Sequence, residues 1–199
     1  MLTASYLYLL CQAFDIRALQ ADFNRALASV VQEELSTHFG ERLPTSLSLN
    51  VIKSMLRTLD STTTMDAAPR MTHVAGASVP ILLDFFTTGP SVDPSVFSAI
   101  PAFRASVASR ATSLLVALRK EYLSGARGQA PASDYLGRTR PIYEFVRLTL
   151  GIRMHGSENE NVFANGLGVE DVTIGQNVTL IHEVRDTILD ELRESSCST

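Results

Sequence analysis

Histidine, cysteine and carboxylate side chains are the groups in this 199-residue chain that could bind a metal ion or take part in catalysis. The four histidines, which form no ligand cluster in the sequence, are His38, His73, His155 and His182. His182 and Asp186 are four residues apart, so on a helix they would share a face and could hold a metal ion. However, the segment HEVRD lacks the second histidine of the zinc motif HExxH, and no thiol lies nearby. We therefore expect an exposed ion pair and no metal site.

Four arginines lie close together around Tyr143 and Phe145, namely Arg138, Arg140, Arg147 and Arg153. Such a cluster could bind phosphate or nucleic acid. The chain as a whole is acidic, with 17 basic and 21 acidic residues and a pI near 5.6. This balance favours a helix surface whose arginines pair with carboxylates elsewhere, and we expect no nucleic-acid partner.

Two glycines, Gly166 and Gly168, could begin a dinucleotide-binding fingerprint. That motif needs a third glycine at position 171 and a preceding strand, but the sequence has Asp171 and no strand pattern. We therefore expect no cofactor-binding residue.

The two cysteines lie at opposite ends of the chain, Cys11 in an apolar segment and Cys197 in a polar tail. Two such cysteines do not make a disulfide framework, which favours a reducing compartment. The apolar segment LYLLCQA resembles the core of a signal peptide, but it lacks a preceding basic region and continues as a helical pattern. It is also too short to span a bilayer. We expect a soluble, cytoplasmic protein without a membrane partner.

The element that organises the chain is a predicted helix over residues 2–39, a stretch without proline or glycine. Such a helix would be roughly 55 Å long. Residues 6–14 are apolar almost all round, which predicts burial on every side. From Leu19 onward the apolar residues form one stripe, which comprises Leu19, Phe23, Leu27, Val30, Val31 and Leu35. A helix of this kind is typical of the centre of a bundle.

Further helices are predicted over 48–60 and, from an apolar run that would also suit a strand, over 79–86. Residues 61–68 are polar and threonine-rich, and we expect a loop there. Asp93-Pro94 predicts a helix start, and Pro101 should break or kink the helix that follows. A long apolar stripe then predicts a helix over 101–123.

Two more helices are predicted near the C-terminal end. One lies within 137–153, with Pro141 in its first turn and Gly151 ending it in the left-handed conformation. The other opens at the capping box formed by Thr173 and Gln176. No segment shows the alternation of a strand, so the predicted fold class is all-α.

Three segments stand out: SYLYLLCQAFDIRALQADF near the start, and TRPIYEFVRLTLGIR and VEDVTIGQNVTLIHEVRDTIL near the end. They resemble segments of the aromatic amino-acid ammonia-lyases, especially fungal phenylalanine ammonia-lyases. A helical stretch over about 40–136 separates them and matches only loosely. Plant and fungal phenylalanine enzymes have a lid-like helical insertion here that compact bacterial histidine enzymes lack.

The resemblance implies a fold and a division of the chain. The fold would be the C-terminal portion of the helical bundle typical of the L-aspartase/fumarase group. Residues 1–39 would be the core-bundle helix, 40–136 the shielding insertion, and 137–199 the helices that return to the core. Family members assemble as homotetramers, so the resemblance implies a homo-oligomer or association with an N-terminal catalytic part.

The family's reaction removes a β-proton and the amine from an amino acid, using a self-formed methylidene-imidazolone cofactor, a tyrosine base and an arginine that holds the carboxylate. The cofactor arises from an Ala-Ser-Gly triplet, which this sequence does not contain. Tyr6 and Tyr8 match the family downstream of its catalytic residues, so we expect core packing for both. No catalytic residue can be assigned to any position of this sequence.

These observations predict a C-terminal portion of a phenylalanine ammonia-lyase, inactive alone, whose full enzyme would convert L-phenylalanine to trans-cinnamate and ammonia. A gene fragment, a split gene and a truncated paralogue all remain open, as do tyrosine and histidine as substrates. The alternative is a non-catalytic helical scaffold or an assembly partner of a full-length lyase. Because residues 6–14 leave no polar face, we also expect the chain to associate with copies of itself or with an N-terminal catalytic part.

Overall fold

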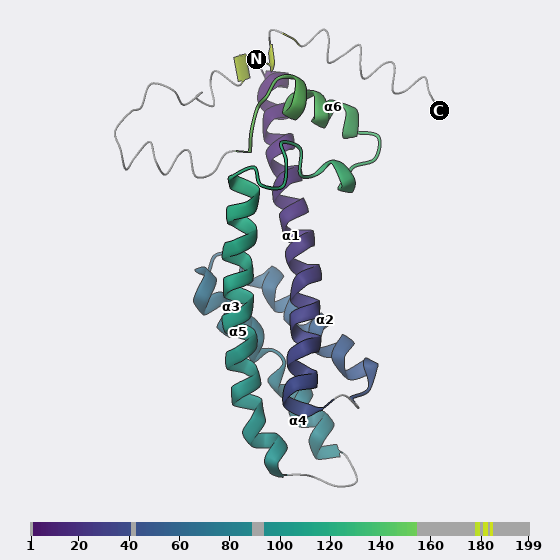
Figure 1. Ribbon diagram of the computed structural model, residues 1–199, viewed down its shortest axis with the longest axis vertical. Coiled ribbons are helices and arrows are strands. Elements are labelled where there is room, and N and C mark those ends of the chain that lie inside the picture. The colour runs from purple at the N-terminus through teal and green to yellow at the C-terminus, as the bar shows by residue number, and fades with distance from the viewer. Residues whose placement is uncertain are drawn as a thin grey trace, which may run out of the picture. The chain divides into compact units, whose positions relative to one another are not determined.

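The computed structural model describes residues 2–40, 43–88 and 94–154, together with residues 178, 179, 181, 182 and 184. Regular structure in these residues is entirely helical, which confirms the predicted all-α class (Figure 1). The elements are α1 (Leu2–Phe39), α2 (Thr45–Ser61), α3 (Ala67–Gly76), α4 (Val79–Thr88), α5 (Pro94–Leu123), the 3₁₀ helix η1 (Ser133–Tyr135), α6 (Arg140–Glu144) and the π-helix η2 (Phe145–Thr149).

The chain forms two compact units. One comprises Met1–Ala21 and Arg119–Thr199, and the other comprises Asp22–Leu118. Helices α1 and α5 each contribute residues to both units. The units therefore do not follow the expected division into 1–39, 40–136 and 137–199, which describes parts of a longer enzyme and stays a prediction.

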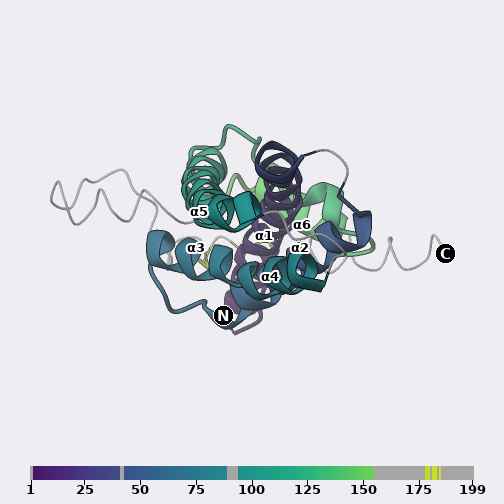
Figure 2. The same cartoon turned by 90° about the horizontal axis from the view of Figure 1, so that it is seen from below.

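In the unit Asp22–Leu118, helices α2, α3 and α4 form a layer against the second half of α1 and most of α5 (Figures 1 and 2). The predicted stripe of α1 is confirmed, since Phe23, Leu27, Val31 and Leu35 are buried. Helix α5 contributes Phe103, which is fully buried and packs against the ring of Phe39. The predicted helix over 48–60 is also confirmed and buries five side chains of α2, Leu47, Val51, Ile52, Met55 and Leu59.

Two expectations for this unit were wrong. The loop predicted over 61–68 ends at Asp66, and α3 follows it. Ten residues with three buried side chains give too weak a period to be found in the sequence. The expected break at Pro101 was wrong, because α5 runs through this residue, whereas a kink stays a prediction. The apolar positions continue across the proline, from Ile100 to Phe103 and Val107, and their burial outweighs one lost backbone hydrogen bond.

In the other unit, one side of α1 packs on the segment from Tyr122 to Ile152. The shared core includes Tyr8, Cys11, Ala18, Tyr143 and Val146, and all five are buried. The opposite side of α1 is exposed, with Tyr6 at 68%, Leu9 at 61% and Ile16 at 56% of their full accessibility. Burial on every side is thus wrong for this chain alone, and so is core packing of Tyr6, whereas Tyr8 is in the core.

The helix predicted within 137–153 is present, but it changes from an α-helix to a π-helix along its length. α6 has Pro141 in its first turn, η2 continues as a π-helix, and Gly151 adopts the predicted left-handed conformation with φ 68°. The predicted capping box of Thr173 and Gln176 lies outside the described residues. Val178 and Ile181, which follow it, are buried in the same core as Tyr143.

Candidate functional site

The most elaborate polar arrangement in the unit that holds α6 is a buried triad of Asp15, Tyr143 and Arg147. Asp15 lies on α1 and is fully buried, as are the other two side chains. Tyr143 donates its hydroxyl hydrogen bond to Asp15 Oδ1, and Arg147 Nη2 donates to Asp15 Oδ2. Each carboxylate oxygen therefore has its own donor, and the carboxylate joins α1 to α6 and η2.

Backbone groups around the triad add two further hydrogen bonds, while Arg147 Nε is buried without a hydrogen-bond partner among the described residues. The backbone N–H of Ala132 donates to the Tyr143 hydroxyl at 3.1 Å, and Arg147 Nη1 donates to the Ile152 carbonyl at 2.8 Å. The left-handed Gly151 turns the chain so that the Ile152 N–H bonds the Val146 carbonyl at 3.2 Å. The two bonded residues are six positions apart, one more than in the Schellman ending of an α-helix, because the preceding segment is the π-helix η2. The turn thus places the carbonyl of Ile152 beside Arg147.

Burial raises the pKa of three ionisable side chains in this region. Burial, followed by the hydrogen bond to Asp15, raises the pKa of the Tyr143 hydroxyl, which therefore stays protonated. Burial also raises the pKa of the Asp15 carboxyl, and the charge of Arg147 opposes that effect. Burial raises the pKa of the neighbouring Cys11 thiol to about 11. A protonated, buried thiol is a poor nucleophile. The hydrogen bonds of the triad connect α1 to α6 and η2.

The arginine cluster predicted from the sequence does not form one surface. Arg140 pairs with Glu144 on α6 at 2.7 Å, as the carboxylate-pairing interpretation predicts. Arg147 also pairs with a carboxylate, but its place on a helix surface was wrong because it is fully buried against Asp15. Arg138 and Arg153 are exposed.

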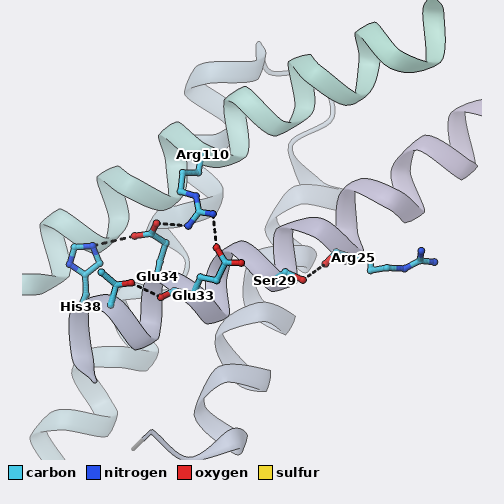
Figure 3. Close-up of polar contacts among 7 residues, drawn as sticks. Arg25, Ser29, Glu33, Glu34, His38 and Arg110 are labelled. Atoms are coloured by element: carbon cyan, nitrogen blue, oxygen red, sulfur yellow. Dashed lines mark hydrogen bonds and ion pairs between the residues drawn. The ribbon is translucent and has the colours of Figure 1, made fainter. Parts of the chain in front are cut away.

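A second polar network ties α1 to α5 in the unit Asp22–Leu118 (Figure 3). Arg110 of α5 reaches two neighbouring carboxylates of α1, with Nη1 2.7 Å from Glu34 Oε1 and Nη2 2.6 Å from Glu33 Oε2. His38, one turn further along α1, places Nε2 3.3 Å from Glu34 Oε2. The imidazole also meets the Phe103 ring edge-on.

Glu34 is the buried member of this network, whereas Glu33 is exposed. Burial by itself would raise the pKa of the Glu34 carboxyl. Hydrogen bonds from Arg110 and Ser106 and the positive charge of Arg110 outweigh burial, and the pKa is lowered. Glu34 is therefore ionised and fully engaged as an acceptor, which again indicates a structural role.

No group of three or more potential metal ligands occurs among the residues that the structure describes. Asp186, the proposed partner of His182, lies outside those residues, as does Cys197. The prediction of an ion pair at 182 and 186 therefore stays a prediction. None of the helices in the described ranges is long and apolar enough to cross a membrane.

No model of a known protein family matches the chain. Individual proteins do match it. The chain is 60% identical over 194 residues to phenylalanine ammonia-lyase str11 of Strobilurus tenacellus, and 51% identical over 191 residues to the phenylalanine ammonia-lyase of Flammulina velutipes. These matches cover 94% and 93% of this chain but only 27% and 26% of the relatives.

The fold agrees with the sequence comparison. The crystal structure of phenylalanine ammonia-lyase from Rhodosporidium toruloides matches this chain with a TM-score of 0.76 and 28% identity, over 96% of this chain and 29% of that one. The chain belongs to the aromatic amino-acid ammonia-lyase family. It corresponds to a C-terminal portion of the ammonia-lyase fold and spans about a quarter of the length of the curated relatives it matches.

For this ammonia-lyase chain, sequence reasoning missed the triad centred on Asp15. One signal was available, because Asp15 interrupts the apolar run between Phe14 and Ile16. An ionisable residue within a predicted core helix requires a buried partner. The sequence offered several arginines as that partner, and only the fold selects Arg147.

Proposed function

We propose that this chain is a structural part of a phenylalanine ammonia-lyase and contributes no catalytic group. The complete enzyme would deaminate L-phenylalanine to trans-cinnamate and ammonia. The observation that carries the proposal is the 60% identity to an enzyme of that name, which extends over 94% of this chain. Phenylalanine as the substrate rests on the names of the relatives.

The chain's own residues support the non-catalytic part of this proposal. The family's cofactor forms from an Ala-Ser-Gly triplet, which the 199 residues do not contain. This chain therefore cannot form the group that makes the amine a leaving group. Tyr6 is exposed, and Tyr8 is buried in the core of the unit.

The structural role we propose is to supply a core helix and the helices that hold it. The triad of Asp15, Tyr143 and Arg147 fastens α1 to the segment after α5, and the Glu34–Arg110 network fastens α1 to α5. The exposed apolar side of α1, which carries Tyr6, Leu9, Leu10 and Ile16, would pack on helices of other subunits, in a homotetramer. The buried free thiol of Cys11 suits a reducing compartment, and we propose the cytoplasm.

The direct test is an activity assay on the purified chain. We expect no increase in cinnamate absorbance when the chain is incubated with L-phenylalanine, and the heat-treated chain serves as the control. Turnover above that control would contradict the non-catalytic role, because it would require a base and an electrophile that we do not find in the sequence.

A non-catalytic scaffold that assembles with a full-length lyase is the second candidate. The exposed apolar side of α1 fits this candidate equally well. Reading the genomic sequence upstream of Met1 separates the two, because an in-frame Ala-Ser-Gly segment would favour part of an enzyme and its absence would favour a scaffold.

A further inference from the structure

A small pocket lies beside the C-terminal end of α5, within the unit that also holds the buried triad. Its volume is about 190 Å³. The walls come from the end of α5, from the loop that follows it, and from the chain just after Gly151. The residues that matter for its chemistry are Tyr122, Ser124, Gln129, Arg153 and Met154.

Arg153 gives the pocket a positive charge. Its guanidinium has no ion pair or hydrogen bond among the residues that the structure describes, in contrast to Arg140 and Arg147. The nearby carboxylate of Glu121 is paired with Arg127 at 3.0 Å, so its charge is compensated. Ser124 and Gln129 line the same pocket. An unpaired guanidinium is suited to bind a carboxylate, because its planar fork can donate two parallel hydrogen bonds.

Apolar residues and glycines form the remaining walls of the pocket. Leu123, Pro131 and Met154 supply apolar surface, and the ring of Tyr122 forms part of the wall. Gly125 and Gly128 adopt positive φ angles of 73° and 88°, a conformation that favours glycine, and an added Cβ at either would meet open space. The loop therefore leaves the pocket unfilled by side chains at both positions.

The volume limits the size of the ligand. An apolar cavity of about 150 Å³ holds benzene, so a pocket of this size can hold one ring or a short aliphatic chain together with a carboxylate. We propose that this pocket binds a small monocarboxylate with an apolar body, with Arg153 holding the carboxylate and with Leu123, Pro131 and Met154 covering the body. The proposal does not depend on the proposed function.

The test uses the full 199-residue chain and 4-fluorobenzoate as the probe, with binding followed by fluorine NMR. We expect saturable binding that unlabelled benzoate displaces and inorganic phosphate at the same concentration does not. Arg153→Gln should weaken binding at least tenfold, and Arg153→Lys should retain part of the affinity. Arg138→Gln removes an exposed arginine outside the pocket and should leave binding unchanged. Circular dichroism checks that each variant keeps its helix content.

Several outcomes would overturn the proposal. They are an absence of saturable binding to the wild-type chain, equal binding by Arg153→Gln, and equal loss in Arg138→Gln. If phosphate displaces 4-fluorobenzoate as strongly as benzoate does, the pocket is a general anion site. That result would contradict the proposed contacts with the apolar body of the ligand. If Arg153→Gln loses helix content, Gln129→Leu in the exposed loop replaces it, and unchanged binding by that variant would likewise count against the pocket. All these readouts are independent of lyase activity.

Discussion

Asp15 and Arg147 form an ion pair from which water is excluded, since both side chains are fully buried. The desolvation of two charges is compensated by their contact and by the hydrogen bonds of Tyr143 and of the Ile152 carbonyl. Such a pair determines which segments pack together, and it adds little net stability to the folded state. Removing only one partner of the pair should therefore lower the free energy of unfolding.

Replacing Asp15 with asparagine leaves the buried Arg147 without a counter-charge. We expect Asp15→Asn to lower the free energy of unfolding by about 3–5 kcal/mol, measured by urea denaturation and circular dichroism. The double variant Asp15→Leu/Arg147→Met removes both charges and should recover most of that loss. A cost below about 1 kcal/mol for Asp15→Asn would mean that water reaches Arg147 and that the pair is not buried in solution.

Glu34 should make the stability of the chain depend on pH in the acid range. Its pKa is lower in the folded state than the ordinary glutamate value of 4.5, so the folded protein binds fewer protons than the unfolded chain. The resulting stability is present above about pH 5 and is lost as pH falls through the folded-state pKa. The stability of Glu34→Gln should lack this pH-dependent contribution. A parallel decline of the wild type and Glu34→Gln between about pH 5 and pH 3 would contradict the proposed ionisation of Glu34.

Cys11 should be unreactive in the folded chain. Its side chain is fully buried and its pKa is about 11, so only about one thiol in a thousand is ionised at pH 8. In a Cys197→Ser variant, which leaves Cys11 as the only thiol, we expect no reaction with Ellman's reagent until denaturant is added. Rapid labelling of the folded variant would show that this part of α1 opens.

Among the helices, α5 shows a conflict between local preference and tertiary packing. Pro101 lies inside the helix, lacks an N–H and is exposed, while Ile100 and Phe103 beside it are buried. We expect Pro101→Ala to raise the free energy of unfolding by about 2 kcal/mol. A proline inside a helix destabilises the folded state by about 3 kcal/mol, but it also lowers the conformational entropy of the unfolded chain, which offsets part of that cost. Pro94→Ala at the helix start is the matched control and should have little effect. Equal changes in the two variants would contradict a continuous helix.

Long elements with many apolar positions could be predicted from the sequence, and short or irregular ones could not. The apolar stripe of α1 from Leu19 to Leu35 gives a clear helical period, and α2 buries five side chains. The meeting of Tyr143 and Arg147 on Asp15 could not be foreseen, because they lie 128 and 132 residues from it along the chain. The same holds for the Glu34–Arg110 pair, whose members lie 76 residues apart.

At the scale of the whole molecule, the apolar side of α1 should control association. Leu9 and Leu10 are exposed beside Tyr6 and Ile16. Exposure of several large apolar side chains on one face marks an interface. We expect the wild-type chain to be larger than a monomer in light scattering at micromolar concentration, and Leu9→Glu/Leu10→Glu to dissociate it.

Leu148→Glu is the control for that measurement, because Leu148 is also exposed but lies on η2 and not on α1. It should leave the molecular mass unchanged. A monodisperse wild-type monomer, or equal dissociation by Leu148→Glu, would remove the evidence that α1 is the interface.

The proposed role as part of a lyase can be tested most directly by complementation. The chain would be co-expressed with the N-terminal part of the Strobilurus tenacellus enzyme that it does not span, and cinnamate formation from L-phenylalanine would be measured. We expect activity from the pair, none from either part alone, and a large loss with Leu9→Glu/Leu10→Glu. Two well-folded parts that purify together and yet produce no cinnamate would contradict the role as a structural part of the enzyme and would favour a scaffold.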